Sequence, residues 1–287
     1  MVINCYNCGF KTMFKNYEMN SGFEAWLSWL GVPRDKIQQA KLEILSKKLN
    51  GEISVETAAT VNIPVNFAEC SLPKHAKSIS QLLLENCEDD NFLSCVEYLS
   101  LRGRAVFEGL EYYWSPITKN NFNQRIIIPF IHNKKIVGYT GRFAGKPPKD
   151  VPRYLNSELP SNFLFNSDVM NRLNRKFIIL VEGPFDAIAV DGVAVLGSTL
   201  NKNQIAWLNA ADKEIIVLPD REARNQDLID CAIEQKWSVS FPNWEKNIKD
   251  AADASKVYGK LYTIFSVIKF RTNSELQIKM KRQLLKG

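Results

Sequence analysis

Hydrophobic positions change their spacing along this chain, from a helical repeat near the amino end to strand-like runs further on. Apolar residues in 23–49 recur at helical period with a break at Gly31-Val32-Pro33, so one or two helices are expected there. Residues 78–102 repeat the helical pattern and end around Gly103. Residues 50–75 show little periodicity and contain prolines, which is typical of a linker.

The pattern becomes strand-like from Gln124 onward. Residues 125–131 are β-branched and apolar, residues 132–135 form a polar turn, and residues 136–143 return as a second apolar run. This arrangement predicts a β-hairpin. A proline-bearing loop then leads to the segment Arg153-Tyr154-Leu155-Asn156-Ser157, and polar groups cluster at the predicted strand ends.

Residues 176–254 alternate short apolar runs with helical segments. Strands are expected at 177–181, 193–196 and 214–218, and helices at 184–190, 202–210 and 227–236. Such a rhythm predicts a parallel sheet covered by helices. The expected fold class is therefore α/β, preceded by an amino-terminal part of α+β character.

Acidic residues follow the predicted strands of this region. Glu182 comes directly after the first strand, Asp220 and Glu222 follow the third, and Asp250 lies in a turn after Lys249. The carboxyl ends of parallel strands collect functional groups. Carboxylates are the hard oxygen ligands that Mg²⁺ prefers, so the pattern predicts metal-assisted phosphoryl transfer.

Each acidic position also has a purely structural interpretation. Glu182 could be an acid near a helix amino terminus, stabilised by the helix dipole. Surface turns are rich in Asp and Glu, so the pair Asp220 and Glu222 is a weak signal by itself. The order of three acidic sites at strand or loop edges is what favours a metal site.

Length and composition fit a globular protein with room for a sizeable core, since the chain has 287 residues of which 45% are hydrophobic. Its apolar runs are shorter than the ~18 residues of a membrane span, and no basic-then-apolar leader is visible. We therefore expect a cytoplasmic protein without a membrane segment.

The formal net charge of +6 is distributed unevenly along the chain. Residues 1–90, 91–176, 177–254 and 255–287 carry net charges of −2, +7, −6 and +7, respectively. An acidic segment between two basic ones suits a metal-binding catalytic unit beside surfaces that hold a polyanion. The alternative is that solvated faces simply vary in sign.

Two of the six cysteines, Cys5 and Cys8, have the spacing of one knuckle of a zinc ribbon. A structural zinc site needs four protein ligands, and the sequence contains no second CxxC pair. We therefore expect a half site, with zinc bound only if the missing half is supplied. The other four cysteines are scattered, as reduced thiols usually are.

Taken together, these motifs resemble the DnaG type of bacterial DNA primase, in a compact form such as phages encode. Residues 176–254 resemble the Toprim fold, with Glu182-Gly183 at a strand end, Asp186 in the following helix, and two later acidic turns. Toprim also occurs in topoisomerases, recombination mediators and some nucleases. The upstream order of Arg125, Gly141-Arg142 and Arg153–Ser157 resembles the basic polymerase subdomain that precedes Toprim in primases.

The resemblance covers roughly residues 97–254 and implies a domain order. Residues 1–20 would be the remnant of a zinc-ribbon domain, 21–96 a helical and linker region, and 97–175 the basic subdomain. Residues 176–254 would be the Toprim domain. Residues 255–287 would form a short basic tail of one or two amphipathic helices that packs on Toprim, touches DNA or docks a partner.

Three positions depart from the family pattern. Glu222 stands where the family favours Asp, which lengthens the reach to a metal by one methylene group. Asn225 replaces a glycine, although Asn tolerates left-handed backbone conformations better than most residues. Arg153 stands where Lys is common, and its guanidinium can contact phosphate through two nitrogens.

The resemblance implies a DNA-directed RNA polymerase that makes short RNA primers on single-stranded DNA by metal-dependent nucleotidyl transfer. Glu182, Asp220 and Glu222 would be catalytic, and the same three with Asp250 would hold Mg²⁺ or Mn²⁺. The nucleotide or template would be bound by residues of the basic subdomain: Arg125, Arg142, Arg153, Tyr154 and Asn156. Expected partners are the DNA template, nucleoside triphosphates and a replicative helicase.

Two alternatives remain open from the sequence. The chain could be a Toprim nuclease or topoisomerase-like enzyme, although a nuclease would not need the block at 125–157. It could also be a catalytically weak DNA-binding fragment of a primase, although such a fragment would be expected to lose its acidic residues.

Overall fold

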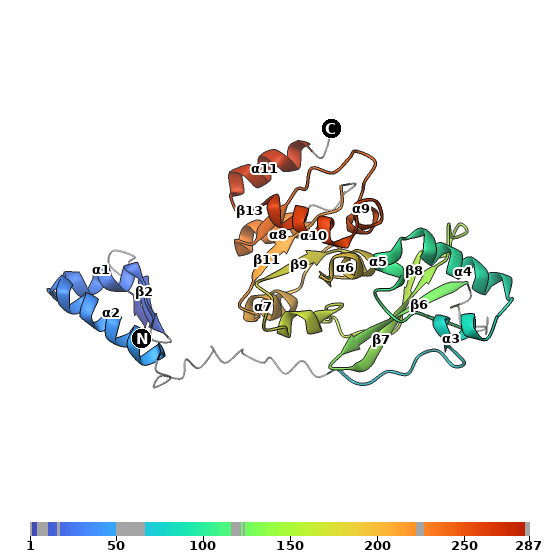
Figure 1. The fold of residues 1–287 in the computed structure, drawn as a ribbon, viewed down its shortest axis with the longest axis horizontal. Coiled ribbons are helices and arrows are strands. Elements are labelled where there is room, and N and C mark those ends of the chain that lie inside the picture. The colour runs from blue at the N-terminus through green and yellow to red at the C-terminus, as the bar shows by residue number, and fades with distance from the viewer. Residues whose placement is uncertain are drawn as a thin grey trace. The chain divides into compact units, whose positions relative to one another are not determined.

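The computed structural model describes residues 2–4, 11–15, 18–49, 67–115, 122, 124–221 and 227–284. The chain divides into two compact units, residues 1–64 and 65–287. This boundary falls inside the range 21–96 that the sequence groups as one helical and linker region. Figure 1 shows the secondary-structure elements of both units.

The first unit contains an antiparallel sheet and two helices. Its strands are β1 (Val2–Asn4), β2 (Lys11–Lys15) and β3 (Glu18–Met19), and its helices are α1 (Ser21–Trp29) and α2 (Arg34–Leu49). The helix break expected at Gly31–Pro33 is confirmed. Asn20 begins α1 by accepting a hydrogen bond from the Phe23 N–H at 2.8 Å. Cys5 and Cys8 lie outside the described residues.

The second unit begins with an antiparallel sheet in the order β4-β5-β6-β7-β8. The strands are β4 (Lys77–Ser78), β5 (Tyr113–Trp114), β6 (Arg125–His132), β7 (Lys135–Phe143) and β8 (Tyr154–Asn156). The expected hairpin is confirmed, because β6 pairs with β7 from Arg125 opposite Phe143 to His132 opposite Lys135. Strand β8 then pairs with the far half of β7.

Three helices accompany this sheet: α3 (Ile79–Leu84), α4 (Asp90–Leu101) and α5 (Arg104–Phe107). The helical segment expected at 78–102 is thus two helices separated by a turn. Asp89 starts the second of them, because its side chain accepts a hydrogen bond from the Phe92 N–H at 3.0 Å. Near the carboxyl end of α4, Tyr98 contacts Arg142 of β7.

The second sheet has the order β10-β9-β11-β12-β13 and confirms the parallel α/β fold expected from the sequence. Strands β9 (Phe177–Val181), β10 (Val193–Ala194), β11 (Glu214–Val217) and β12 (Ser238–Ser240) are parallel. The edge strand β13 (Arg271–Thr272) is antiparallel to β12. The connecting helices are α6 (Pro184–Val190), α7 (Lys202–Ala210) and α8 (Asp227–Gln235), and a short 3-10 helix, η2 (Ser167–Asn171), precedes β9.

The carboxyl-terminal region packs on this second sheet. It contains α9 (Ala251–Tyr258), α10 (Lys260–Lys269) and α11 (Glu275–Leu284). Val267 of α10 and Ile278 of α11 are buried in the core, and the Trp244 indole N–H donates to the Ser266 hydroxyl at 2.8 Å. Of the three roles open for the tail, packing on the sheet domain is therefore observed.

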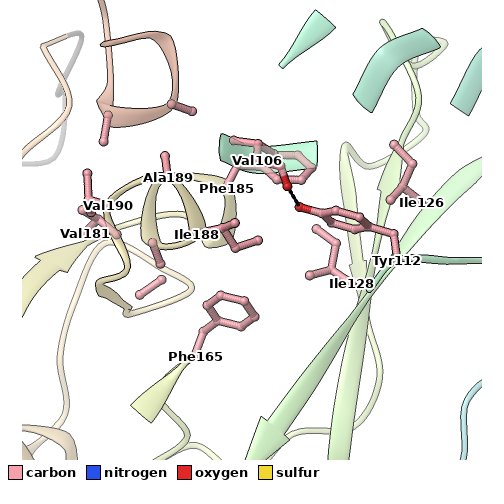
Figure 2. Packing of buried hydrophobic residues seen from close by; sticks show 14 of the residues in the cluster. Val106, Tyr112, Ile126, Ile128, Phe165, Val181, Phe185, Ile188, Ala189 and Val190 are labelled. Atoms are coloured by element: carbon pink, nitrogen blue, oxygen red, sulfur yellow. Dashed lines mark hydrogen bonds between the residues drawn. The ribbon is translucent and has the colours of Figure 1, made fainter. Parts of the chain in front are cut away.

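Helix α6 lies between the two sheets of the second unit. All seven of its residues are buried, and its apolar side chains belong to a core cluster that also contains residues of β6 and β9. Figure 2 shows Phe185 and Ile188 of α6 in the same cluster as Ile126 and Ile128 of β6. The Tyr112 hydroxyl donates to the Val106 carbonyl at 2.6 Å within this cluster. One continuous core thus joins the two sheets.

None of the helices described in the structure combines the length and the apolar character that a membrane crossing requires.

Candidate active site

A cavity of about 430 Å³ lies where the ends of the two sheets meet. One wall carries carboxylates from the second sheet and the other carries arginines from the first sheet and α4. The polar and charged residues that line it are Arg102, Thr140, Arg142, Arg153, Tyr154, Asn156, Glu182, Asp186, Ser198, Asp220 and Asp250. The cavity therefore brings together seven of the residues that the sequence selects as site residues.

The carboxylates reach the cavity because of where the parallel strands end. Glu182 follows β9, Asp220 lies in the loop after β11, and Asp250 is the residue that begins α9. The Arg221 N–H donates to the Lys249 carbonyl at 2.9 Å, which brings the loop after β11 beside the start of α9. The sheet edge thus gathers acids that are far apart in the sequence.

Asp186, in the first turn of α6, belongs to the same acidic group. Its carboxylate is buried and accepts a hydrogen bond from the Ala252 N–H at 3.0 Å. Burial raises the pKa of Asp186 well above its usual value, and the charges of Asp250 and Asp220 add to that shift. The sequence shows this residue in the Toprim-like motif, but its closeness to the other acids depends on the fold.

Glu182 is the acid with an unsatisfied oxygen. Burial raises the pKa of Glu182, and its buried Oε1 has no hydrogen-bond partner among the residues that the structure describes. A buried polar atom left without a partner costs free energy unless a ligand satisfies it. Gly183 follows it, and a Cβ atom at this position would lie 3.1 Å from an Asp186 carboxylate oxygen. Glycine thus keeps the space beside the Asp186 carboxylate clear.

Asp250 has a structural contact as well as a place in the cavity. Its side chain accepts a hydrogen bond from the Asp253 N–H at 2.7 Å, which caps α9. Burial raises the pKa of the Asp250 carboxyl group, although the Arg102 guanidinium opposes the shift. Asp250 therefore caps α9, and its role as a metal ligand stays a prediction.

The opposite wall comes from β7, β8 and the segment before β8. Arg142 lies on β7, Tyr154 and Asn156 lie on β8, and Arg153 precedes β8. The Arg142 guanidinium lies 4.7 Å from the centre of the Tyr154 ring. Burial raises the pKa of Tyr154 to about 12, so this phenol stays neutral.

Arg102 and Tyr98, both at the carboxyl end of α4, also belong to this wall, although the sequence did not predict them. Arg102 lines the cavity, and the Tyr98 hydroxyl accepts hydrogen bonds from Arg102 and from Arg142. Arginine next to glycine at a helix end, here Arg102-Gly103, is the only sequence signal, and it is shared with many ordinary helix ends.

Arg125 does not line the cavity. It is buried, and its guanidinium donates to the carbonyls of Gly141 at 2.9 Å and Pro152 at 2.8 Å, with a longer contact to Arg153 at 3.4 Å. These bonds tie the end of β7 to the segment that leads into β8. They fix the backbone that carries Arg142 and Arg153, while a direct nucleotide contact by Arg125 stays a prediction.

Replacing Arg125 with methionine should therefore lower stability, because buried carbonyls lose charged donors. We expect a loss of about 3 kcal/mol, or roughly 6–12 °C in melting temperature. The exposed Arg153→Met is the matched control and should change stability by less than ~0.5 kcal/mol. Thermal unfolding of both variants checks this, and an unchanged melting temperature for Arg125→Met would contradict the bracing role.

The acidic wall fits a divalent cation that shares its ligands with a substrate. Within the described part of the chain, no three His, Cys, Asp or Glu side chains form a metal site by themselves. Mg²⁺, however, is commonly held by one or two carboxylates together with substrate phosphates and waters. The unsatisfied Glu182 oxygen and the mutual repulsion among Asp186, Asp220 and Asp250 are features that a cation would relieve. Glu222 lies outside the described residues.

Comparisons with known proteins place the chain near bacterial DNA primases, although no family model matches it. It is 33% identical over 117 residues to a DNA primase of Thermotoga maritima, covering 36% of this chain and 20% of that protein. It is 32% identical over 118 residues to a DNA primase of Enterococcus faecalis, covering 35% and 19%. The chain thus spans about a fifth of the length of these curated relatives.

Solved primase structures give a partial likeness. The E. coli primase catalytic core has a TM-score of 0.49 and 16% identity, covering 68% of this chain and 77% of that one. The zinc-binding and RNA polymerase domains of Aquifex aeolicus primase have a TM-score of 0.46 and 18% identity, covering 93% and 60%. The resemblance to DNA primases that the motifs predict is confirmed by sequence similarity over about a third of the chain.

Proposed function

We propose that this protein synthesises short RNA primers on single-stranded DNA by metal-dependent transfer of nucleotides from nucleoside triphosphates. The observation that carries the proposal is that acids and arginines line the same cavity. The acids are Glu182, Asp186, Asp220 and Asp250, and the arginines are Arg102, Arg142 and Arg153. Acids that can hold a cation beside arginines that can hold phosphates are the groups that such a transfer requires. The similarity to DNA primases supports the same reaction.

The basic wall would bind and orient the negatively charged substrates. Guanidinium groups contact phosphate oxygens through pairs of N–H donors, and Arg153 is exposed and available for such contacts. Asn156 would donate or accept hydrogen bonds to a nucleotide. Tyr154 would contact a nucleotide by stacking or hydrogen bonding, and Arg142 lies over one face of its ring.

The acidic wall would bind the metal ions and accept the proton of the attacking 3′-hydroxyl group. Asp220, Asp250 and Asp186 would hold Mg²⁺ or Mn²⁺, and Glu222 would join them from the same loop as Asp220. When bound, the ions supply charge neutralisation of the triphosphate and a lower pKa of the hydroxyl group. Glu182, whose pKa is raised by burial, is the proposed proton acceptor or a further ligand.

Primer synthesis by the full chain on single-stranded DNA with labelled ribonucleotides and MgCl₂ tests the proposal. We expect short RNA products that require template and disappear on chelation of the metal. A second arm adds a separate zinc-ribbon module and a replicative helicase, which we propose as a partner on the resemblance alone. Metal-dependent degradation of DNA without RNA synthesis in either arm would instead support the Toprim nuclease alternative.

A further inference from the structure

The phenol oxygen of Tyr98 joins two of the arginines that face the acidic group. Arg142 donates to it from Nε at 3.1 Å and from Nη2 at 2.7 Å. Arg102 donates from Nε at 3.1 Å and also from Nη2. A hydroxyl oxygen has two acceptor lone pairs, so this one oxygen accepts hydrogen bonds from both guanidinium groups.

The ring of Tyr98 supports the same arrangement from the side. The guanidinium carbon of Arg102 lies 5.0 Å from the ring centre of Tyr98 and 5.4 Å from that of Phe185. The guanidinium carbon of Arg142 lies 5.5 Å from the Tyr98 ring. Cation–π contacts therefore add to the hydrogen bonds that keep both guanidinium groups beside Tyr98.

Two neighbouring guanidinium groups repel each other, so their closeness needs a reason. Neither donates to a carboxylate among the described residues, although Arg102 acts electrostatically on both Asp250 and Asp186. Nη1 of each arginine makes no hydrogen bond within the described ranges, and both arginines line the cavity. The pair therefore donates to Tyr98 and keeps further N–H donors for an anion in the cavity.

We propose that Tyr98 is a positioning residue that holds Arg102 and Arg142 as a paired guanidinium cradle for the polyphosphate of a bound nucleotide. The inference rests on the proposed function for the identity of the nucleotide, but the polyphosphate chemistry follows from the arginines alone. Without the hydroxyl, Arg102 is free to turn toward Asp250 and Asp186. The anion site would then lose one of its two arginines, and the acidic wall would gain an ion pair in the place of a metal ion.

Tyr98→Phe tests this role because it removes the oxygen and keeps the ring. We expect the affinity for inorganic triphosphate, measured by calorimetry with the full chain and MgCl₂, to fall at least ~10-fold. The affinity for a short oligothymidylate should change by less than ~3-fold. In primer synthesis, the KM for ribonucleotides should rise by a similar factor while kcat changes little.

Tyr112→Phe is the matched control, because it also removes a hydrogen-bonded hydroxyl, one that donates to the Val106 carbonyl at 2.6 Å in the buried core. It should lower the melting temperature without changing triphosphate affinity. If Tyr98→Phe proves unstable, Arg142→Lys serves as the second variant, since it keeps the charge and loses the fork that Tyr98 orients. Its triphosphate affinity should fall by the same factor.

The outcomes separate this inference from the proposed function. Equal triphosphate affinity of folded Tyr98→Phe and the unchanged protein would overturn the positioning role, even if primers are made. Loss of oligothymidylate binding without loss of triphosphate binding would overturn it too. Weaker triphosphate binding by the variant supports the role, even if no primer synthesis is found in the unchanged protein.

Discussion

Replacing Asp220 with asparagine should lower the rate of primer synthesis by roughly 100- to 1,000-fold while the protein stays folded. Asp220 lines the cavity at the end of the central strand β11, and its charge acts on Asp186. Asparagine keeps the size of the side chain but removes the negative charge that a divalent cation requires. Initial rates of RNA synthesis at saturating nucleotide and MgCl₂ measure the effect.

Asp212→Asn is the control for this variant. Asp212 is exposed and precedes the same strand at its opposite end, so the substitution removes an equal charge far from the cavity. It should leave the rate within about 2-fold of the unchanged protein. A normal rate for Asp220→Asn, with Asp212→Asn also normal, would remove Asp220 from the proposed catalytic group.

Replacing Asp186 with asparagine should stabilise the metal-free protein near pH 8 and remove much of its stabilisation by MgCl₂. Burial and the charges of Asp250 and Asp220 raise the pKa of Asp186, so its ionised form is disfavoured in the folded state. Asparagine can still accept the hydrogen bond from the Ala252 N–H. A change of ~1 kcal/mol would move the melting temperature by about 2–4 °C in a chain of this size.

The dependence on pH has a definite sign. Because the folded-state pKa is raised, stability is lost as the pH rises from the usual Asp pKa of about 4 through the folded value, and the full penalty holds above it. The melting temperatures of the unchanged protein and of Asp186→Asn should therefore converge as the pH falls. Asp90→Asn, at an exposed position, should show no such convergence. A variant that is less stable at pH 8 without metal would contradict the prediction.

Much of the second sheet could be predicted because its elements are local and strongly patterned. The limits of β9, α6 and α7 agree with the apolar runs, and Glu182 could be placed at the sheet edge from its position after β9. Strand β12 could not be predicted, since Ser238 and Ser240 interrupt its apolar character. Both serines are buried and are satisfied by the Glu214 carboxylate and the Val267 carbonyl, which come from distant segments.

The basic wall was less predictable than the acidic one. In the sequence, Arg125 resembles a charged surface residue at the end of a hairpin. Only the fold shows that its guanidinium group donates to backbone carbonyls. Tyr98 and Arg102 lie on a helix about 40 residues before Arg142, and their meeting depends on how α4 packs against β7. Side chains that pair across about 40 residues leave no regular spacing in the sequence, whereas carboxylates at strand ends can be recognised because they follow an apolar run.

The burial of α6 also bears on how a nucleotide would enter. Its apolar residues contribute to the core shared by both sheets, and it begins directly beside Glu182 and Gly183. A hinge motion that separated the acidic wall from the basic wall would have to expose this shared core to water. We therefore expect the two walls to stay together when a nucleotide binds, because separating them costs the free energy of exposing that core.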